Sequence, residues 1–126
     1  MARSVIREKS FLFALEVIKP FKVLQAGHEY VLSKQLLRSG TSIGANVEEA
    51  LAAQSRRDSL SKMAVASKEA HESRYWLLLL QKSGLTKVGL NLALENNDEL
   101  IRIRTSIVKT TAESPATQNS KFKTQN

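Results

Sequence analysis

Apolar residues recur along this chain at steps of three, four and seven, which is the period of an amphipathic helix. One stripe is formed by Leu32, Leu36, Ile43, Val47 and Ala50. Three other stretches keep a helical period, and none alternates as a strand would. The pattern predicts helices over about residues 3–25, 30–56, 58–82 and 86–111. Short connections between four such helices predict an all-α, antiparallel up-down-up-down four-helix bundle over residues 1–113. The polar stretch 114–126 has no period and is predicted to be a disordered tail.

The stretch 39–45, Ser-Gly-Thr-Ser-Ile-Gly-Ala, is rich in small residues. Glycine inside a helix costs roughly 1 kcal/mol relative to alanine, so its presence suggests a use for the space. The stretch could serve close contact with another helix, or it could bend the helix. It could also form a turn, with Thr41 or Ser42 capping a new helix.

The first helix contains a proline and ends near a glycine. We expect its apolar face to be formed by Phe11, Ala14, Leu15, Ile18, Phe21 and Leu24. Pro20 must kink or break the helix, and the unchanged apolar phase on both sides favours a kink. Gly27 is expected to be the C-cap, with His28 solvated in the following loop.

The third helix should begin at a cap formed by Ser55 or Asp58 and end before a C-cap at Gly84. Its expected apolar stripe is Leu60, Ala64, Ser67, His71, Tyr75 and Leu78, with Met63, Ala70 and Leu77 beside it. On that stripe, His71 would be half-buried and hydrogen-bonded. Residues 75–80 are apolar around the whole helix, which predicts that the outer face around Leu77–Leu80 meets another subunit. The fourth helix keeps its period through Leu92, Leu100, Ile103 and Ile107.

The composition indicates a basic surface and argues against disulfides, thiolate chemistry and a membrane span. The chain of 126 residues is long enough for one domain and carries a formal net charge of +7 with a pI near 9.9. This excess is spread over the chain and favours polyanionic partners such as RNA or DNA. Cysteine is absent and no apolar run approaches a membrane span, so we expect a soluble cytoplasmic protein without a membrane partner.

No catalytic or metal-binding signature is present in the sequence. The Glu-x-x-His pairs of di-iron bundles are missing, and Gly40-x-x-x-Gly44 is not followed by the Lys and Ser/Thr of a phosphate-binding loop. We therefore expect no enzyme activity, no cofactor and no metal. Phosphate contact remains possible through cations at helical spacing, and the alternative is an ordinary solvated surface in which Arg74 pairs with a carboxylate. The candidates are Lys34, Arg38, Arg56, Arg57, Lys62, Lys68 and Arg74.

Three blocks of the sequence resemble the four helix bundle protein family, whose members are encoded in intervening sequences of 23S rRNA genes. The blocks are residues 35–50, residues 54–58 and residues 67–77, in the family's order. The resemblance covers about residues 8–112. The position of Pro20 departs from the family, in which proline often lies nearer the first loop.

The resemblance implies properties that the spacing does not show. It implies that the second helix continues through the small residues 39–45. It also implies a homopentamer and, from a related branch, binding to nucleic acid and to a reverse transcriptase or another protein. No catalytic activity is implied. The residues that match the family motif are candidates for assembly or for a polar network: Arg38, Ser42, Asn46, Glu48, Glu49, Lys68, Glu69, Glu72, Tyr75 and Trp76. The alternative function is a structural protein–protein interaction module whose basic charge is incidental.

Overall fold

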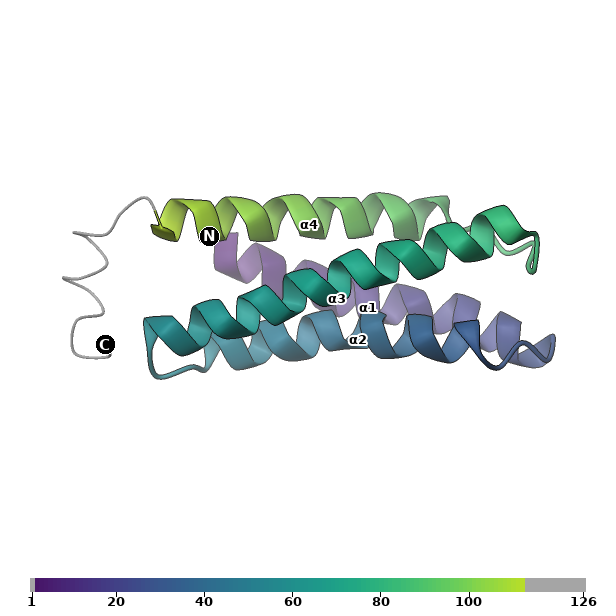
Figure 1. The fold of residues 1–126 in the computed structure, drawn as a ribbon, viewed down its shortest axis with the longest axis horizontal. Coiled ribbons are helices and arrows are strands. Elements are labelled where there is room, and N and C mark those ends of the chain that lie inside the picture. The colour runs from purple at the N-terminus through teal and green to yellow at the C-terminus, as the bar shows by residue number, and fades with distance from the viewer. Residues whose placement is uncertain (1, 113–126) are drawn as a thin grey trace.

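Four antiparallel helices form the molecule in the computed structural model, which describes residues 2–112 and the side chains of residues 5–103. They are α1 (Ala2–Ala26), α2 (Leu32–Leu51), α3 (Arg56–Ser83) and α4 (Asn91–Ala112). Figure 1 shows them running alternately along one long axis. α1 and α3 each pack against both α2 and α4, so they occupy opposite corners of the bundle. The predicted four-helix bundle is confirmed, whereas the predicted tail over 114–126 lies outside the described residues.

α2 is one continuous helix through the small residues 39–45, so the turn alternative is wrong. The small residues let α1 and α2 come close. A β-carbon at Gly40 would lie 2.8 Å from Val17 Cγ2, and one at Gly44 would lie 3.4 Å from the backbone oxygen of Ser10. Gly40 is therefore needed for close helix contact, which offsets its low helix propensity, whereas Gly44 leaves room for a β-carbon at ordinary contact distance.

The start of α2 is fixed by Glu29. Its carboxylate accepts hydrogen bonds from the backbone N–H groups of Val31, Leu32 and Ser33 at 3.1, 2.9 and 2.7 Å. These groups belong to the first turn, where backbone donors have no partner inside the helix. Burial raises the pKa of Glu29, but the three backbone hydrogen bonds together outweigh it and the net pKa is lowered.

α1 passes through Pro20 without a break, and Pro20 is buried. The helix ends at Ala26, so Gly27 lies at the predicted C-cap position. His28, not Gly27, adopts the left-handed conformation, with φ = 67°. The Glu29 and His28 N–H groups donate to Leu24 and Gln25 oxygens at 2.8 and 3.0 Å, which is the Schellman pattern. The His28 side chain is exposed, as predicted.

α3 has the caps that the sequence predicted. Ser55 Oγ accepts a hydrogen bond from the Asp58 N–H at 3.0 Å, and Gly84 follows the helix with φ = 73°. α4 begins at Asn91, five residues after the predicted start at Thr86. No helix in the described part of the chain combines the length and apolarity needed to cross a membrane.

The core side of α1 is only partly the one predicted. Ile6, Phe13, Val17 and Leu24 are buried, whereas Phe11 is 63% exposed and Leu15 is 48% exposed. Apolar residues surround α1 on all sides, so the period alone could not distinguish the core face. The side of α1 that becomes buried is the one that packs against α2 and α4.

α3 likewise buries the stripe that the sequence placed second. Its core residues include Met63, Ala70 and Leu77, while His71 is exposed and not half-buried. Leu77 and Leu80 are fully buried in the bundle's own core. Only part of the predicted apolar patch at residues 77–80 therefore remains on the surface.

The core also contains polar residues. Ser73 Oγ of α3 donates a hydrogen bond to Ser39 Oγ of α2 at 2.9 Å, and both residues are fully buried. Asn97 of α4 is fully buried as well, and neither its Oδ1 nor its Nδ2 has a hydrogen-bond partner among the described residues. On the same helix Leu100 is buried, but Leu92, which the sequence placed on the apolar face, is exposed.

Candidate functional site

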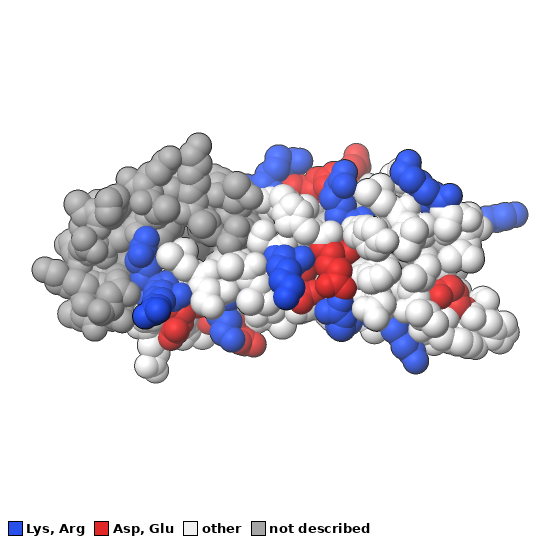
Figure 2. Space-filling model, in the orientation of Figure 1, with Lys and Arg blue, Asp and Glu red and all other residues white. Residues whose placement is uncertain are grey.

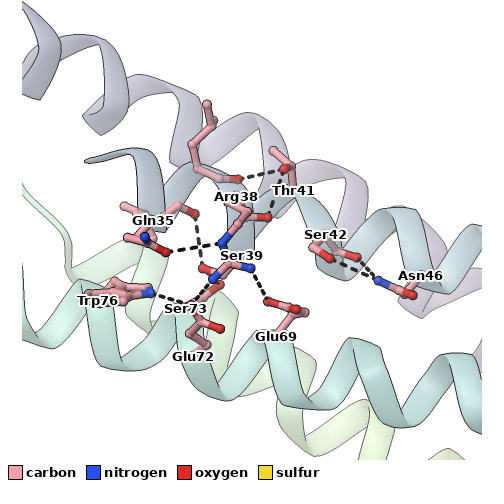
Figure 3. Close-up of polar contacts among 12 residues, drawn as sticks. Gln35, Arg38, Ser39, Thr41, Ser42, Asn46, Glu69, Glu72, Ser73 and Trp76 are labelled. Atoms are coloured by element: carbon pink, nitrogen blue, oxygen red, sulfur yellow. Dashed lines mark hydrogen bonds and ion pairs between the residues drawn. The ribbon is translucent and has the colours of Figure 1, made fainter. Parts of the chain in front are cut away.

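Arg38 joins α2 to α3 at the centre of a polar network (Figure 3). Its Nη1 donates to Glu69 Oε1 at 3.2 Å, and its Nη2 donates to Glu72 Oε2. Trp76 Nε1 donates to the same Glu72 oxygen at 2.9 Å, and Arg38 Nε donates to Gln35 Oε1 at 3.3 Å. The structure thus places three of the predicted network residues, Glu69, Glu72 and Trp76, around one guanidinium.

The arrangement of this network favours helix pairing over chemistry. The Glu69 side chain is only 12% exposed, and a carboxylate with so little water needs a cation. Arg38 supplies that cation and also faces Glu72, so its hydrogen bonds are directed at α3. Arg38 was a candidate for phosphate contact, and it could reach a phosphate only through the half of its side chain that stays exposed.

Most of the other predicted network residues lie elsewhere on the surface. Asn46 donates to the backbone oxygen of Ser42 at 2.9 Å and to its hydroxyl at 3.1 Å, which keeps it within α2. Glu48 pairs with Arg7 at 2.7 Å. Tyr75 is 59% exposed, and its ring meets the Trp76 ring edge-on with 5.1 Å between centroids.

Two further candidate cations pair with carboxylates. Lys62 Nζ lies 2.8 Å from Glu49 Oε1, and Arg74 Nε lies 2.9 Å from Asp98 Oδ1. The hydrogen bond from Lys62 to Glu49, helped by the charge of Glu49, raises the pKa of Lys62. For Arg74, the structure thus has the pairing with a carboxylate that was the alternative to phosphate contact.

A second set of cations lies along the outer side of α3. Arg57, Lys68 and Lys82 are exposed, and none of them lies within 4.0 Å of a carboxylate oxygen among the described residues. Positions 57, 68, 75 and 82 are separated by close to whole numbers of turns, so they lie in one line on the helix. We call Arg57, Lys68, Tyr75 and Lys82 the α3 outer ridge. Lys34 on α2 is also exposed and has no ion pair in the described part.

Sequence reasoning missed Lys82, although its spacing of seven from Tyr75 and fourteen from Lys68 could have revealed it. Figure 2 shows Lys and Arg spread along the length of one face, with acidic groups beside several of them. The basic charge is therefore distributed and does not gather into one patch on that face. Arg56, the remaining candidate, is half-buried at the start of α3.

The surface grooves in the described part of the chain are lined by ion pairs and apolar side chains. One groove is lined by Arg7, Glu8, Phe11, Leu12 and Glu48, and it combines an ion pair with apolar side chains. No group of three or more potential metal ligands occurs among the described residues. The structure thus defines a small basic antiparallel bundle in which most of the candidate polar residues form ion pairs or hydrogen bonds with other residues of the bundle.

The chain belongs to the 23S rRNA-intervening sequence protein family, whose sequence pattern matches residues 3–106. The family resemblance seen in the sequence is confirmed. A crystal structure of a protein with unknown function from the S23 ribosomal protein family of Bacteroides thetaiotaomicron VPI-5482 has the same fold. That protein is 40% identical, with a TM-score of 0.81 over 86% of this chain and 99% of the other. A comparison with curated proteins gives no significant match. The family is not a known enzyme family.

Proposed function

We propose that this protein is a non-catalytic homo-oligomeric bundle that binds the backbone of RNA or DNA through the α3 outer ridge. The observation that carries the proposal is the line formed by Arg57, Lys68 and Lys82, none of which forms an ion pair within 4.0 Å in the described part. A net charge of +7 supports the same conclusion, because it favours contact with polyanions.

The ridge is suited to phosphate contact and not to reading bases. Its cations are spread over about 38 Å of helix, at roughly 1.5 Å per residue. Each long side chain can neutralise one phosphate and release counterions, and such contacts carry no sequence information. Binding should therefore be steep in salt and tolerant of sequence.

Fluorescence anisotropy with mixed-sequence RNA and DNA at 50 to 200 mM salt tests the proposal. The test variant combines Arg57→Ala, Lys68→Ala and Lys82→Ala. The matched control combines Arg7→Ala, Lys9→Ala and Lys62→Ala, which removes the same charge from residues that are already ion-paired.

For duplex DNA, the logarithm of the binding constant falls linearly with the logarithm of the salt concentration, and each phosphate contact contributes roughly 0.9 to the slope. The slope of the ridge variant should therefore be smaller by about 2 to 3. The control should keep most of the slope. Absence of binding at low salt, or an equal loss in the control, would contradict the assignment to the ridge.

The proposal includes self-assembly into a homopentamer in the cytoplasm, which the family resemblance suggests. Several apolar side chains remain on the surface of the single bundle, and Phe11 is the most exposed aromatic among them. Five copies would multiply the charge and raise the local attraction for phosphate. Multi-angle light scattering should give a mass that corresponds to five subunits of 14.0 kDa or to a multiple of five, and a monomer at micromolar concentration would overturn the oligomer.

The second candidate function is a structural module that binds a protein, such as a reverse transcriptase, with incidental charge. The ion pairs of Arg38, Lys62 and Arg74 favour it, because they occupy three of the proposed phosphate ligands. Nucleic-acid binding that is undetectable at low salt would select this alternative.

A further inference from the structure

The outer face of α1 carries a regular stripe that the bundle does not use. Val5, Leu12 and Leu15 are 40%, 50% and 48% exposed, and Glu8, Lys19 and Lys22 are exposed as well. The positions 5, 8, 12, 15, 19 and 22 follow one another at steps of three and four. This is the spacing of a helix face that packs lengthwise against another helix. We call these six residues the α1 seam.

The charges of the α1 seam have no ion-pair partner among the described residues. Arg7 and Lys9 on the same helix pair with Glu48 of α2 and Glu99 of α4. Glu8, Lys19 and Lys22, in contrast, make no ion pair and no side-chain hydrogen bond among the described residues. One end of the seam is thus acidic, its middle is apolar, and its other end is basic.

We infer that the α1 seam packs antiparallel against the α1 seam of a second copy of this chain. The inference rests on the proposed homo-oligomer and adds a second kind of contact to it, one that joins two rings. A two-fold axis between residues 13 and 14 places Leu12 opposite Leu15 of the partner subunit. The same axis places Glu8 opposite Lys19 of the partner subunit, and symmetry repeats both contacts.

The charge order argues for a second copy as the occupant. A two-fold contact joins the same surface to itself, so the surface must be its own complement. The antiparallel arrangement meets this condition, because the acidic end of each seam lies against the basic end of the other. A parallel arrangement would oppose Glu8 to Glu8 and Lys19 to Lys19. The seam spans about 26 Å at 1.5 Å per residue, and Phe11 lies at its edge.

The two-fold contact differs from the contacts of a ring. A five-membered ring uses two different faces of each subunit, whereas the seam uses one face twice. The seam alone gives a dimer, and acting together with a ring it gives ten subunits in two joined rings. The mass of the wild-type assembly should therefore be an even multiple of 14.0 kDa.

Disulfide trapping tests the register directly, because the chain contains no cysteine. The double variant Glu8→Cys/Lys19→Cys should form an intermolecular disulfide under mild oxidation. The two positions are eleven residues apart on one helix, or about 16 Å, so they cannot bond within a chain. The single variant Glu8→Cys is the control and should stay largely uncrosslinked. Absence of the crosslink in the double variant, or equal crosslinking in the control, would overturn the register.

Charge reversal supplies an independent readout in the same assembly. Glu8→Lys or Lys19→Glu alone should weaken association at least tenfold, and the swap Glu8→Lys/Lys19→Glu should restore most of it. Circular dichroism shows whether each variant stays helical. An oligomer whose mass none of these variants changes would contradict the seam and leave the proposed function standing. A monomeric wild type would contradict both the seam and the proposed homo-oligomer.

Discussion

Gly40 of α2 lies so close to α1 that a β-carbon at position 40 would come 2.8 Å from Cγ2 of Val17. Two more Val17 atoms would lie at 3.1 and 3.3 Å, and a buried valine has no flexible end that could move away. α1 and α2 are therefore held together at a point where only a hydrogen atom fits.

Gly40→Ala should destabilise the protein although alanine is the better helix former. Overpacking costs about 1–3 kcal/mol, which exceeds the roughly 1 kcal/mol gained in helix propensity. We expect a net loss of about 1 kcal/mol in the free energy of unfolding, measured by urea denaturation. Adding Val17→Ala should make the glycine substitution less harmful, because it frees the space.

Gly44→Ala is the matched control for Gly40→Ala. Its β-carbon would approach the Ser10 backbone oxygen only to 3.4 Å, which is ordinary contact. The change should leave stability unchanged or raise it by up to about 1 kcal/mol. If Gly40→Ala and Gly44→Ala lost equal stability, the close contact of Gly40 with Val17 would not be the cause of the loss.

Arg38→Met should loosen the contact between α2 and α3. The substitution leaves Glu69, whose side chain is 12% exposed, without its cation. Breaking a buried ion pair costs about 3–5 kcal/mol, and the half-exposed guanidinium reduces the expected loss to about 1–2 kcal/mol. Trp76 is the only tryptophan and bonds to Glu72, so its fluorescence should report the change during unfolding.

Lys62→Met serves as the control for Arg38→Met. Lys62 and Glu49 form an ion pair in which both side chains are about half exposed, and pairs of this kind contribute little. We expect no measurable change in stability. A loss as large as that of Arg38→Met would mean that burial of Glu69 is not the cause.

Glu29→Gln should weaken the start of α2 in a pH-dependent manner. The pKa of Glu29 is lowered in the folded protein, so the carboxylate stabilises the fold above its unfolded pKa of about 4.3. This contribution is lost as the pH falls through the folded pKa. At pH 7 the variant should be about 1 kcal/mol less stable than the wild type. The difference should shrink as the pH falls below about 4, and a difference independent of pH would contradict the role of the charge.

Asn97→Leu should stabilise the bundle. Asn97 is fully buried, and its amide has no partner among the described residues, so leucine of similar size removes a desolvation penalty. We expect a gain of about 1–2 kcal/mol in thermal or urea unfolding. Asn97→Asp, which buries a charge at the same place, should be strongly destabilising. A loss with leucine would show that the amide makes a hydrogen bond that the described residues do not provide, for example to a buried water.

The candidate site was only partly predictable from the sequence. The family motif singled out Glu69, Glu72 and Trp76, and the structure joins them around Arg38. The sequence could not show that Arg38 reaches the carboxylates of α3, because that depends on the rotation of α2 against α3. It named Lys68 and Arg57 but not their alignment with Lys82 on one side of α3.

By itself the sequence determined the number of helices, their order and several of their ends. Ser55 and Gly84 act locally, through a hydroxyl that accepts one N–H and a backbone free to adopt positive φ, so their roles could be read without a fold. Only the tertiary structure decided which sides of α1 and α3 are inside. Leu15 is exposed and Ser73 is buried, because burial depends on which helices lie nearby as well as on side-chain polarity. A serine fits between closely packed helices where its hydroxyl finds a partner, as that of Ser73 does on Ser39.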